Sequence, residues 1–299
     1  MASIKEVKWA ITGGGGQLAR SLENLLKNQG VNYRSWGKSD LDVSGPENAT
    51  KIMEFSPTVI VNCAAWTNVE AAESYFEQAV LANRDGARNM ALVAKSMNIP
   101  LIHISTDYVF SGDRQIPWKV DDETRPSSKY GESKLLGEIE IKKIWPEKSV
   151  ILRTSWLYSP YCKNFAKTII KKAIMTEETI NVVNDQRGQP TSTFDLAQRI
   201  FEVAKLDNVS GVYHASNSGE ATWWDFACEL FYLSGKSINR VNPIPSYKYP
   251  SPIKRPKYTV LDHANWDKVG LESMQDWRDA LREIFPAILK EVERELYVG

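Results

Sequence analysis

Apolar segments alternate with amphipathic helical segments along the first half of this chain, and the alternation limits the folds that it can adopt. Residues 7–13 have the pattern of a strand, and residues 17–29 repeat leucines on one face of a helix. The same patterns predict strands at 31–36, 58–65, 100–106 and 149–158, and helices at 46–56, around 74–97 and after residue 127 or 128. We therefore expect an α/β fold with a Rossmann-type, doubly wound parallel sheet, which binds ligands at the carboxyl ends of its strands.

Four consecutive glycines, Gly13 to Gly16, separate the first strand from the first helix. Glycine allows positive φ angles and lets backbone N–H groups approach a pyrophosphate at a helix N-terminus. Gly14 and Gly16 followed by Ala19 match the general dinucleotide-binding fingerprint, whereas Gly13 and Gly16 followed by Ala19 match its short-chain variant. Both registers stay open. The strand and helix around the loop favour a bound dinucleotide over a simple flexible turn.

The end of the second predicted strand bears on which dinucleotide binds. A free ribose 2′-hydroxyl usually meets an acidic residue at this position. Here the strand contains Arg34 and is followed by Lys38, and the first acid, Asp40, comes late. A base without a nearby acid favours a 2′-phosphate, so we expect NADP(H) in preference to NAD(H). The alternative is a solvated loop that carries its lysine by chance.

The composition excludes several classes of function. Lys+Arg and Asp+Glu number 37 each among 299 residues, so no net field recruits nucleic acid or an anionic membrane. The cysteines Cys63, Cys162 and Cys228 lack metal-ligand spacing and indicate a reducing compartment. No signal-peptide core and no apolar run of membrane-spanning length is visible. We expect a soluble, cytoplasmic protein.

The alternating pattern weakens after about residue 156. Proline, tryptophan and tyrosine then become frequent, as in PIPSYKYPSPIKRPKY at 243–258. We expect residues 1–155 to form an NAD(P)-binding Rossmann domain, with parts of 192–216 packed on it. Residues 156–299 are expected to form mainly a smaller C-terminal, substrate-binding lobe.

Two motifs that follow the glycine loop carry candidate chemistry. The fourth predicted strand ends in Thr106-Asp107-Tyr108, and Tyr130 and Lys134 lie one turn apart on the next helix. A lysine ammonium beside a tyrosine stabilises the phenolate and lowers its pKa. A strand-end hydroxyl can orient a ketone oxygen that receives a proton from the tyrosine, while a nicotinamide delivers hydride to the carbon. A Tyr-x-x-x-Lys pair alone arises by chance on surface helices, so the order of the motifs carries this prediction of ketone reduction.

These motifs, in this order, resemble the dTDP-4-dehydrorhamnose reductase family of extended short-chain dehydrogenases/reductases. The resemblance spans nearly the whole chain and rests on the segments TGGGGQLA, LDVSGPE, VNCAAWTNVEAAE, HISTDYVFSG, YGESKLLGE, RTSWLY, DQRGQPT and PSPIKRPKYTVLD. It implies NAD(P)H-dependent reduction of the C4 ketone of dTDP-4-dehydro-L-rhamnose to dTDP-L-rhamnose. That reaction belongs to the synthesis of an activated sugar for polysaccharides.

The resemblance also implies roles for individual residues. Thr106, Tyr130 and Lys134 match the catalytic triad. The positions expected to contact the cofactor are Gly13, Gly16, Gln17, Leu18, Lys38, Asp42, Val43, Ala64, Ala65, Asn83, Tyr130 and Lys134. The positions expected to line the sugar pocket are Val69, Thr106, Asp107, Tyr108, Tyr130 and Trp156.

The chain departs from the family pattern at two positions, and several roles stay open. Ala19 stands where a third glycine is usual, and Trp66 stands where a tyrosine is usual. Trp156 could equally be a core residue, and Asp107 could cap a turn. His103 lies inside an apolar strand and is expected to be a core histidine. Some family members bind Mg²⁺ at a dimer contact, but its ligands cannot be assigned in this sequence, so Mg²⁺ and a homodimer stay open.

Three alternatives to this function remain. Nucleotide-sugar 4,6-dehydratases share the scaffold but place Asp-Glu after the threonine, whereas here Tyr108 follows Asp107, so elimination lacks its base. A reductase or epimerase of a different nucleotide ketosugar could use the same triad. A non-catalytic regulatory subunit, resembling the β subunit of methionine adenosyltransferase, could keep the fold, although the retained triad favours catalysis.

Overall fold

The centre of the fold is a six-stranded sheet in which each neighbouring pair of strands is parallel. The computed structural model describes residues 7–249, 251, 253 and 255–297. Residues 1–6, which belong to the expected Rossmann domain, lie outside the described residues. Three positions of the proline-rich segment 243–258 also lie outside them. The strand order is β10-β5-β4-β3-β1-β2. The bounds are β1 Lys8–Thr12, β2 Asn32–Trp36, β3 Val59–Asn62, β4 Leu101–Thr106, β5 Ser149–Thr154 and β10 Gly211–His214.

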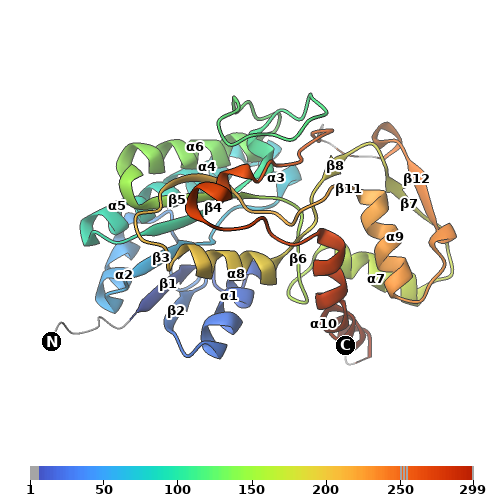
Figure 1. Cartoon of the computed structure of the whole chain (residues 1–299), viewed down its shortest axis with the longest axis horizontal. Helices are drawn as coiled ribbons and strands as arrows, with labels where there is room; N and C mark the ends of the chain where they lie inside the picture. The colour runs from blue at the N-terminus through green and yellow to red at the C-terminus, as the bar shows by residue number, and fades with distance from the viewer. Residues whose placement is uncertain (1–6, 250, 252, 254, 298–299) are drawn as a thin grey trace.

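Helices cover both faces of this sheet (Figure 1). Their bounds are α1 Gln17–Asn28, α2 Ala49–Phe55, α5 Gly86–Met97, α6 Lys129–Ile144 and α8 Thr193–Val203. Successive strand residues point to opposite faces. Accordingly, Ile11 and Val61 pack in one core with α1 and α8, whereas Ala10 and Ile60 pack in another with α2, α5 and α6. The expected doubly wound α/β fold is confirmed.

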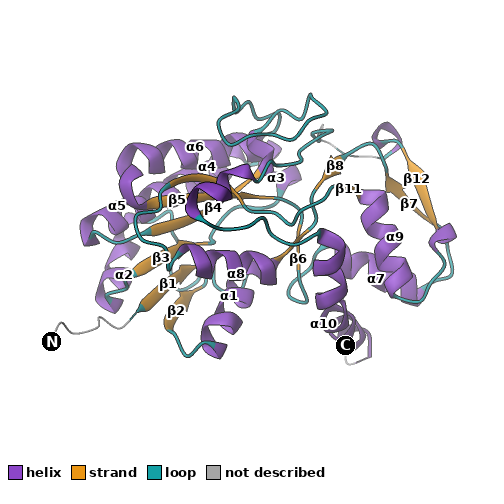
Figure 2. Cartoon of the chain, in the orientation of Figure 1, coloured by secondary structure: helices purple, strands orange, loops and turns teal. Residues whose placement is uncertain are grey.

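A smaller lobe lies beside the sheet and holds three helices and three short strand pairs (Figure 2). Aromatic and aliphatic side chains fill its core. Its helices are α7 Phe165–Met175, α9 Trp223–Leu233 and α10 Trp277–Tyr297. Its strand pairs are β6 Leu157–Tyr158 with β9 Thr191–Ser192, β7 Ile180–Val183 with β12 Val241–Ile244, and β8 Arg187–Gly188 with β11 Ala221–Thr222.

Two segments of the second half of the chain return to the larger lobe. Helix α8 and strand β10 pack on α1 and β5, respectively. The 3₁₀ segment η7, Ala264–Val269, brings Trp266 against Tyr213 with ring centroids 4.6 Å apart. A boundary near residue 155 remains our proposal, because β5 ends at Thr154 and the chain then leaves the sheet.

Two predicted elements differ from the structure. The helix expected at 74–97 begins earlier and is divided into α3 Val69–Ser74, α4 Phe76–Val80, a π-helical turn η2 Leu81–Asp85, and α5. The strand expected at 149–158 stops at Thr154, because Trp156 has φ +44° and turns the chain toward β6. The remaining 3₁₀ turns are η1 Pro46–Asn48, η3 Asp107–Val109, η4 Pro146–Lys148, η5 Ile238–Arg240 and η6 Ser246–Lys248.

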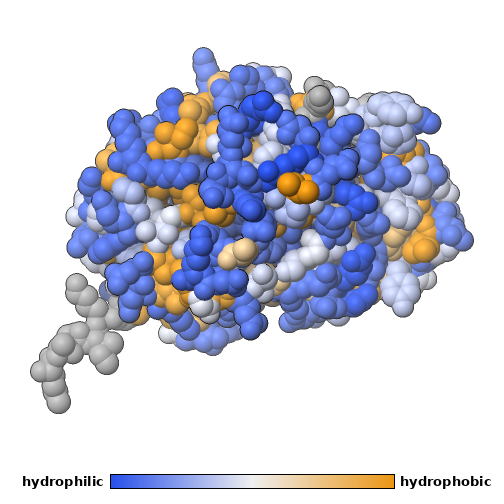
Figure 3. All heavy atoms as spheres, turned by 45° about the horizontal axis from the view of Figure 1, so that its top comes forward, coloured by the Kyte–Doolittle hydropathy of each residue, from blue (hydrophilic) through white to orange (hydrophobic). Residues whose placement is uncertain are grey.

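Hydrophilic side chains cover most of the face shown in Figure 3, and hydrophobic side chains form small separate groups on it. Within the part of the chain that the structure describes, no helix is both long and apolar enough to span a lipid bilayer.

Candidate active site

A cavity of about 610 Å³ opens at the carboxyl ends of β1, β3, β4 and β5. This is the edge at which doubly wound sheets bind their ligands. Most of the residues selected from the sequence line it: Gly13, Gly16, Gln17, Leu18, Ala64, Ala65, Val69, Thr106, Asp107, Tyr108, Tyr130, Lys134 and Trp156. Five chain segments that are separated in the sequence therefore meet at one place.

Gly13 and Gly14 of the glycine loop pack too closely on the neighbouring strands to tolerate side chains. Gly13 has φ +75°, and a Cβ atom there would lie 2.7 Å from the backbone nitrogen of Ala64. A Cβ on Gly14 would lie 2.7 Å from Ser35 Oγ, and Gly14 N donates to Trp36 O at 2.8 Å. Gly13 thus lies against the end of β3, and Gly14 lies against the end of β2.

Helix α1 begins at this loop without a side-chain cap. Its N-cap residue is Gly16, which has no side chain to bond the first N–H groups, and its first turn holds no acid. The N–H groups at a helix start lack partners inside the helix and carry partial positive charge. Gln17, Leu18 and Ala19, the first three residues of α1, line the cavity. These features fit a pyrophosphate group.

The triad residues converge from β4 and α6. Thr106, the last residue of β4, donates from Oγ1 to Asp107 Oδ1 at 3.0 Å and accepts from Tyr108 N at 3.2 Å. The Tyr130 ring meets the Tyr108 ring edge-on, with centroids 5.7 Å apart. Gly131 allows this approach, because a Cβ there would lie 2.1 Å from Tyr108 O.

Burial acts on the protonation of two residues of the triad. It raises the pKa of Tyr130, and the hydrogen bond with Thr106 only partly opposes that rise. Lys134 Nζ donates to Ile104 O at 2.6 Å. Burial also lowers the pKa of Lys134 to about 8. Tyr130 therefore holds its proton at neutral pH, as a proton donor must.

The residues expected at the sugar pocket all line the cavity. Burial raises the pKa of Asp107 to about 6, and Asp107 follows Thr106 directly. The Trp156 ring stacks on the Trp223 ring with centroids 3.6 Å apart and planes 7° apart. Gly188 leaves room for this stack, because a Cβ there would lie 2.6 Å from Trp156. Trp156 is thus half-buried, and it both lines the cavity and belongs to an aromatic stack.

A second cavity of about 790 Å³ adjoins the first. Phe165, Trp223 and Arg255 line both cavities. Arg255 Nη2 lies 3.0 Å from Glu70 Oε1, so this ion pair joins the two lobes at the junction. Burial raises the pKa of Tyr108 to about 12, and the nearby Arg255 opposes the rise.

Comparison with known proteins identifies the relatives of this chain. The model of a family described as "RmlD substrate binding domain" matches residues 7–289. The chain belongs to this family. The resemblance noted in the sequence is confirmed.

Several relatives within the family are named for reductases. A dTDP-4-dehydrorhamnose reductase of Streptomyces griseus is 39% identical, covering 96% of each chain. A probable dTDP-4,6-dihydroxy-2-methyloxan-3-one 4-ketoreductase of Streptomyces antibioticus is 41% identical, covering 95% of this chain and 96% of the relative. The crystal structure of a dTDP-4-dehydrorhamnose reductase from Bacillus anthracis, in complex with NADP, superposes with a TM-score of 0.90 at 34% identity. It covers 94% of this chain and 99% of the other.

Four of the expected cofactor residues lie away from the cavity lining. Asn83 is fully buried in the π-helical turn, where Oδ1 accepts from Trp66 N at 2.8 Å and Nδ2 donates to Ser133 Oγ at 2.8 Å. Its amide thus links the Trp66 loop to α6, and the expected contact of Asn83 with the cofactor stays a prediction. Asp42 Oδ1 accepts from the Ser44 hydroxyl at 2.7 Å, and these Ser44 bonds lower its pKa. The others are Val43, buried against Gly86, and Lys38, exposed after β2.

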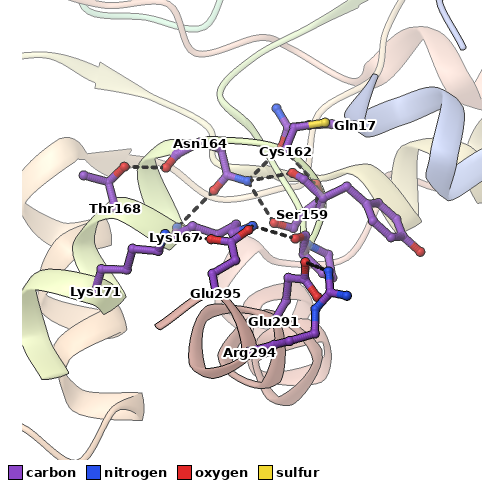
Figure 4. A network of polar contacts seen from close by, with 12 residues as sticks. Gln17, Ser159, Cys162, Asn164, Lys167, Thr168, Lys171, Glu291, Arg294 and Glu295 are labelled. Carbon is purple, nitrogen blue, oxygen red and sulfur yellow. Dashed lines mark hydrogen bonds and ion pairs between the residues drawn. The ribbon is translucent and has the colours of Figure 1, made fainter. Parts of the chain in front are cut away.

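A polar network that has no local sequence signal joins the lobes beside the glycine loop (Figure 4). Gln17 Oε1 accepts from Asn164 Nδ2 and from Ser159 Oγ, both at 2.9 Å. Asn164 also caps α7, because its Oδ1 accepts from Lys167 N at 3.1 Å. Lys167 Nζ then bonds Glu295 Oε1 of α10 at 2.5 Å. The cofactor loop is thereby linked through α7 to the C-terminal helix.

Other lining residues also lacked a sequence signal. Thr154 ends β5 beside Thr106, and its buried hydroxyl has no partner among the described residues. Cys162 Sγ lies 3.3 Å from Gly15 O. Among the described residues, no cluster of three or more His, Cys, Asp or Glu side chains could hold a metal ion.

Proposed function

We propose that this chain catalyses the NADPH-dependent reduction of the C4 ketone of dTDP-4-dehydro-L-rhamnose to dTDP-L-rhamnose. One observation carries the proposal: Tyr130, a half-buried tyrosine with a raised pKa, shares a cavity with Thr106 and with a glycine cradle that fits a pyrophosphate. The name of the Streptomyces griseus relative supports the substrate class. The NADP in the Bacillus anthracis structure supports a nicotinamide cofactor.

Each triad residue has a distinct role in this reaction. A nicotinamide, when bound, supplies the hydride that the ketone carbon receives. Tyr130 donates its proton to the ketone oxygen, and burial keeps that proton on the phenol at neutral pH. Thr106 orients the same oxygen, for which its hydroxyl must leave Asp107. Lys134 places a positive charge beside the cofactor and the phenol.

The two adjoining cavities suit a substrate that consists of a sugar at one end and a nucleoside at the other. We assign the sugar to the first cavity, between Tyr130 and Trp156, and the nucleoside to the second. Arg255 lines both and therefore lies where a diphosphate would join the two ends. A guanidinium pairs strongly with phosphate oxygens because its N–H groups match their geometry.

Replacement of Arg255 should weaken substrate binding more than catalysis. We expect Arg255→Met to raise KM for the sugar nucleotide roughly tenfold or more, because a hydrogen bond to a charged group contributes about 1.5–3 kcal/mol. Steady-state kinetics at saturating NADPH measures this effect. Arg282→Met is the matched control, since Arg282 bonds Glu229 and Asp279 on the far helices.

A second variant separates phosphate binding from the ion pair between the lobes. Glu70→Gln removes the partner of Arg255 and keeps the guanidinium. We expect its KM to stay near or below the wild-type value. A rise in KM equal to that of Arg255→Met would show that Arg255 serves the ion pair instead.

The proposal includes NADPH as the preferred cofactor. Lys38 is exposed in the loop that follows β2. This loop starts after Trp36, whose backbone oxygen accepts a hydrogen bond from Gly14 of the glycine loop. We expect Lys38→Glu to lower kcat/KM for NADPH roughly tenfold, equivalent to about 1.4 kcal/mol, and to leave kcat/KM for NADH within about twofold. Equal losses with both cofactors would contradict a contact between Lys38 and the 2′-phosphate.

Other features of the proposal follow from the family. A cytoplasmic location fits the free cysteines Cys63, Cys162 and Cys228. Mg²⁺ dependence and a homodimer stay predictions. A different dTDP ketosugar is the second candidate, because the 41% identical relative is named for another ketosugar.

The test is oxidation of NADPH and NADH in the presence of dTDP-4-dehydro-L-rhamnose, followed by absorbance with and without Mg²⁺. We expect turnover that requires the ketosugar. Turnover with another ketosugar alone would change the substrate and keep the mechanism. Tight NADPH binding without turnover of any ketosugar would favour the regulatory subunit.

A further inference from the structure

A row of buried polar side chains crosses three neighbouring strands and ends at Lys134. Thr12, Asn62 and His103 occupy matching positions on β1, β3 and β4. Asn62 Oδ1 accepts from Thr12 Oγ1 at 2.7 Å and from Ala64 N at 3.2 Å. Because a backbone N–H can only donate, the amide oxygen of Asn62 must face Ala64. The amide nitrogen of Asn62 must then face His103.

This orientation fixes the tautomer of His103. Asn62 Nδ2 lies 3.0 Å from His103 Nδ1, so Nδ1 accepts a hydrogen bond and carries no proton. Burial and the nearby charge of Lys134 hold the pKa of His103 well below its usual value, so the ring is neutral. A neutral ring with a bare Nδ1 carries its proton on Nε2. That N–H faces Lys134 Nζ at 3.4 Å.

The imidazole therefore presents a donor to an ammonium group that also only donates. Lys134 has three N–H bonds. Ile104 O accepts one of them at 2.6 Å, and His103 in this tautomer accepts none. We infer that His103 is a positioning residue whose tautomer, fixed by Asn62, turns the other N–H bonds of Lys134 into the cavity. This inference rests on the proposed function, in which Lys134 contacts the cofactor.

The other groups that face Lys134 have fixed roles. Glu138, one turn further along α6, bonds Arg153 of β5 at 2.7 Å and accepts from Ser105 of β4 at 2.6 Å. Cys63, after β3, is a neutral thiol because burial raises its pKa to about 12. Tyr130 on α6 is protonated at neutral pH because burial raises its pKa. His103 differs from them, since its hydrogen-bonding role can be reversed by changing Asn62.

Asn62→Asp is designed to reverse this role while keeping the imidazole. The carboxylate would still accept from Thr12 and Ala64, and its second oxygen would accept a hydrogen bond from a protonated Nδ1. The proton would leave Nε2, which would then accept from Lys134. We expect the Kd for NADPH to rise roughly tenfold, or about 1.4 kcal/mol. His103→Phe removes both ring nitrogens of residue 103. Its ¹⁵N NMR spectrum therefore shows which imidazole signals belong to His103.

The tautomer is read from ¹⁵N NMR of the imidazole rings in the cofactor-free protein, and the Kd from NADPH fluorescence. His214→Phe is the matched control, because His214 is also buried in the sheet but lines neither cavity. We expect a protonated Nε2 in the wild type, a protonated Nδ1 in Asn62→Asp, and an unchanged Kd in His214→Phe.

The tautomer and the Kd for NADPH decide the inference without a ketosugar. A wild-type His103 protonated on Nδ1 would overturn it even if the variants fail to fold. A reversed tautomer with an unchanged Kd would also overturn it. Wild-type protein that binds no nicotinamide cofactor would refute the proposed function and the role of His103 together. Binding of NADPH without turnover of dTDP-4-dehydro-L-rhamnose would refute the sugar assignment alone.

Discussion

Tyr130→Phe should lower kcat by roughly 10²- to 10⁴-fold, the range expected when a general acid is removed. The phenyl ring keeps its edge-on contact with Tyr108, so the cavity should keep its shape. The Kd for NADPH should therefore stay within about twofold of the wild-type value. Single-turnover kinetics with the ketosugar, together with NADPH titration, measures both quantities.

The control for this variant is Tyr213→Phe. Tyr213 is buried on β10 against Trp266 and lines neither cavity. It tests whether loss of any buried phenol impairs the enzyme. A Tyr130→Phe enzyme within a few-fold of wild type would remove Tyr130 as the proton donor.

Lys134→Met should impair both cofactor binding and rate. Methionine preserves the buried aliphatic stem and removes the ammonium group, which bonds Ile104 O and lines the cavity. We expect Kd for NADPH to rise at least tenfold, because hydrogen bonds from charged groups contribute about 1.5–3 kcal/mol. Lys143→Met, at an exposed position of the same helix, should change neither value.

The same lysine predicts the pH dependence of the wild type. Burial lowers the pKa of Lys134 to about 8, below its usual value. Its charge is therefore present below pH 8 and lost as the pH rises through that value. We expect kcat/KM for NADPH, which reports the free enzyme, to decline above about pH 8. A profile that stays flat to pH 10 would contradict this assignment.

The sequence was sufficient for the fold because its signals are local. Apolar periodicity and the glycine loop define β1, α1 and the strands that follow, and these elements dictate a doubly wound sheet. The residues at the ends of those strands, such as Thr106, then meet at one edge. A site built from strand ends can be predicted once the strand order is known.

Features that depend on long-range contacts could not be predicted. Nothing local to residues 69–97 indicates that Asn83 bonds Trp66 and belongs to a π-helical turn. The turn at Trp156 depends on Gly188 and Trp223, which lie more than 30 residues later. Arg255 pairs with Glu70 across 185 positions of sequence.

The pKa values of the site also required the structure. The Tyr-x-x-x-Lys spacing predicts a lysine that lowers the pKa of the tyrosine. In the structure Lys134 is buried and Tyr130 is half-buried, and burial shifts their pKa values in opposite directions. The spacing predicts that Tyr130 and Lys134 lie close together. Their protonation depends on how far the rest of the fold shields them from solvent, and the spacing does not contain this information.

The most direct test of the central claim is to follow a label from cofactor to sugar. The enzyme would be incubated with dTDP-4-dehydro-L-rhamnose and NADPH deuterated at the hydride-donating carbon, and the product examined by NMR. The account predicts dTDP-L-rhamnose with deuterium at C4, formed by the wild type and lost in Tyr130→Phe. Product without deuterium at C4, or equal deuterium incorporation in Tyr130→Phe, would contradict it.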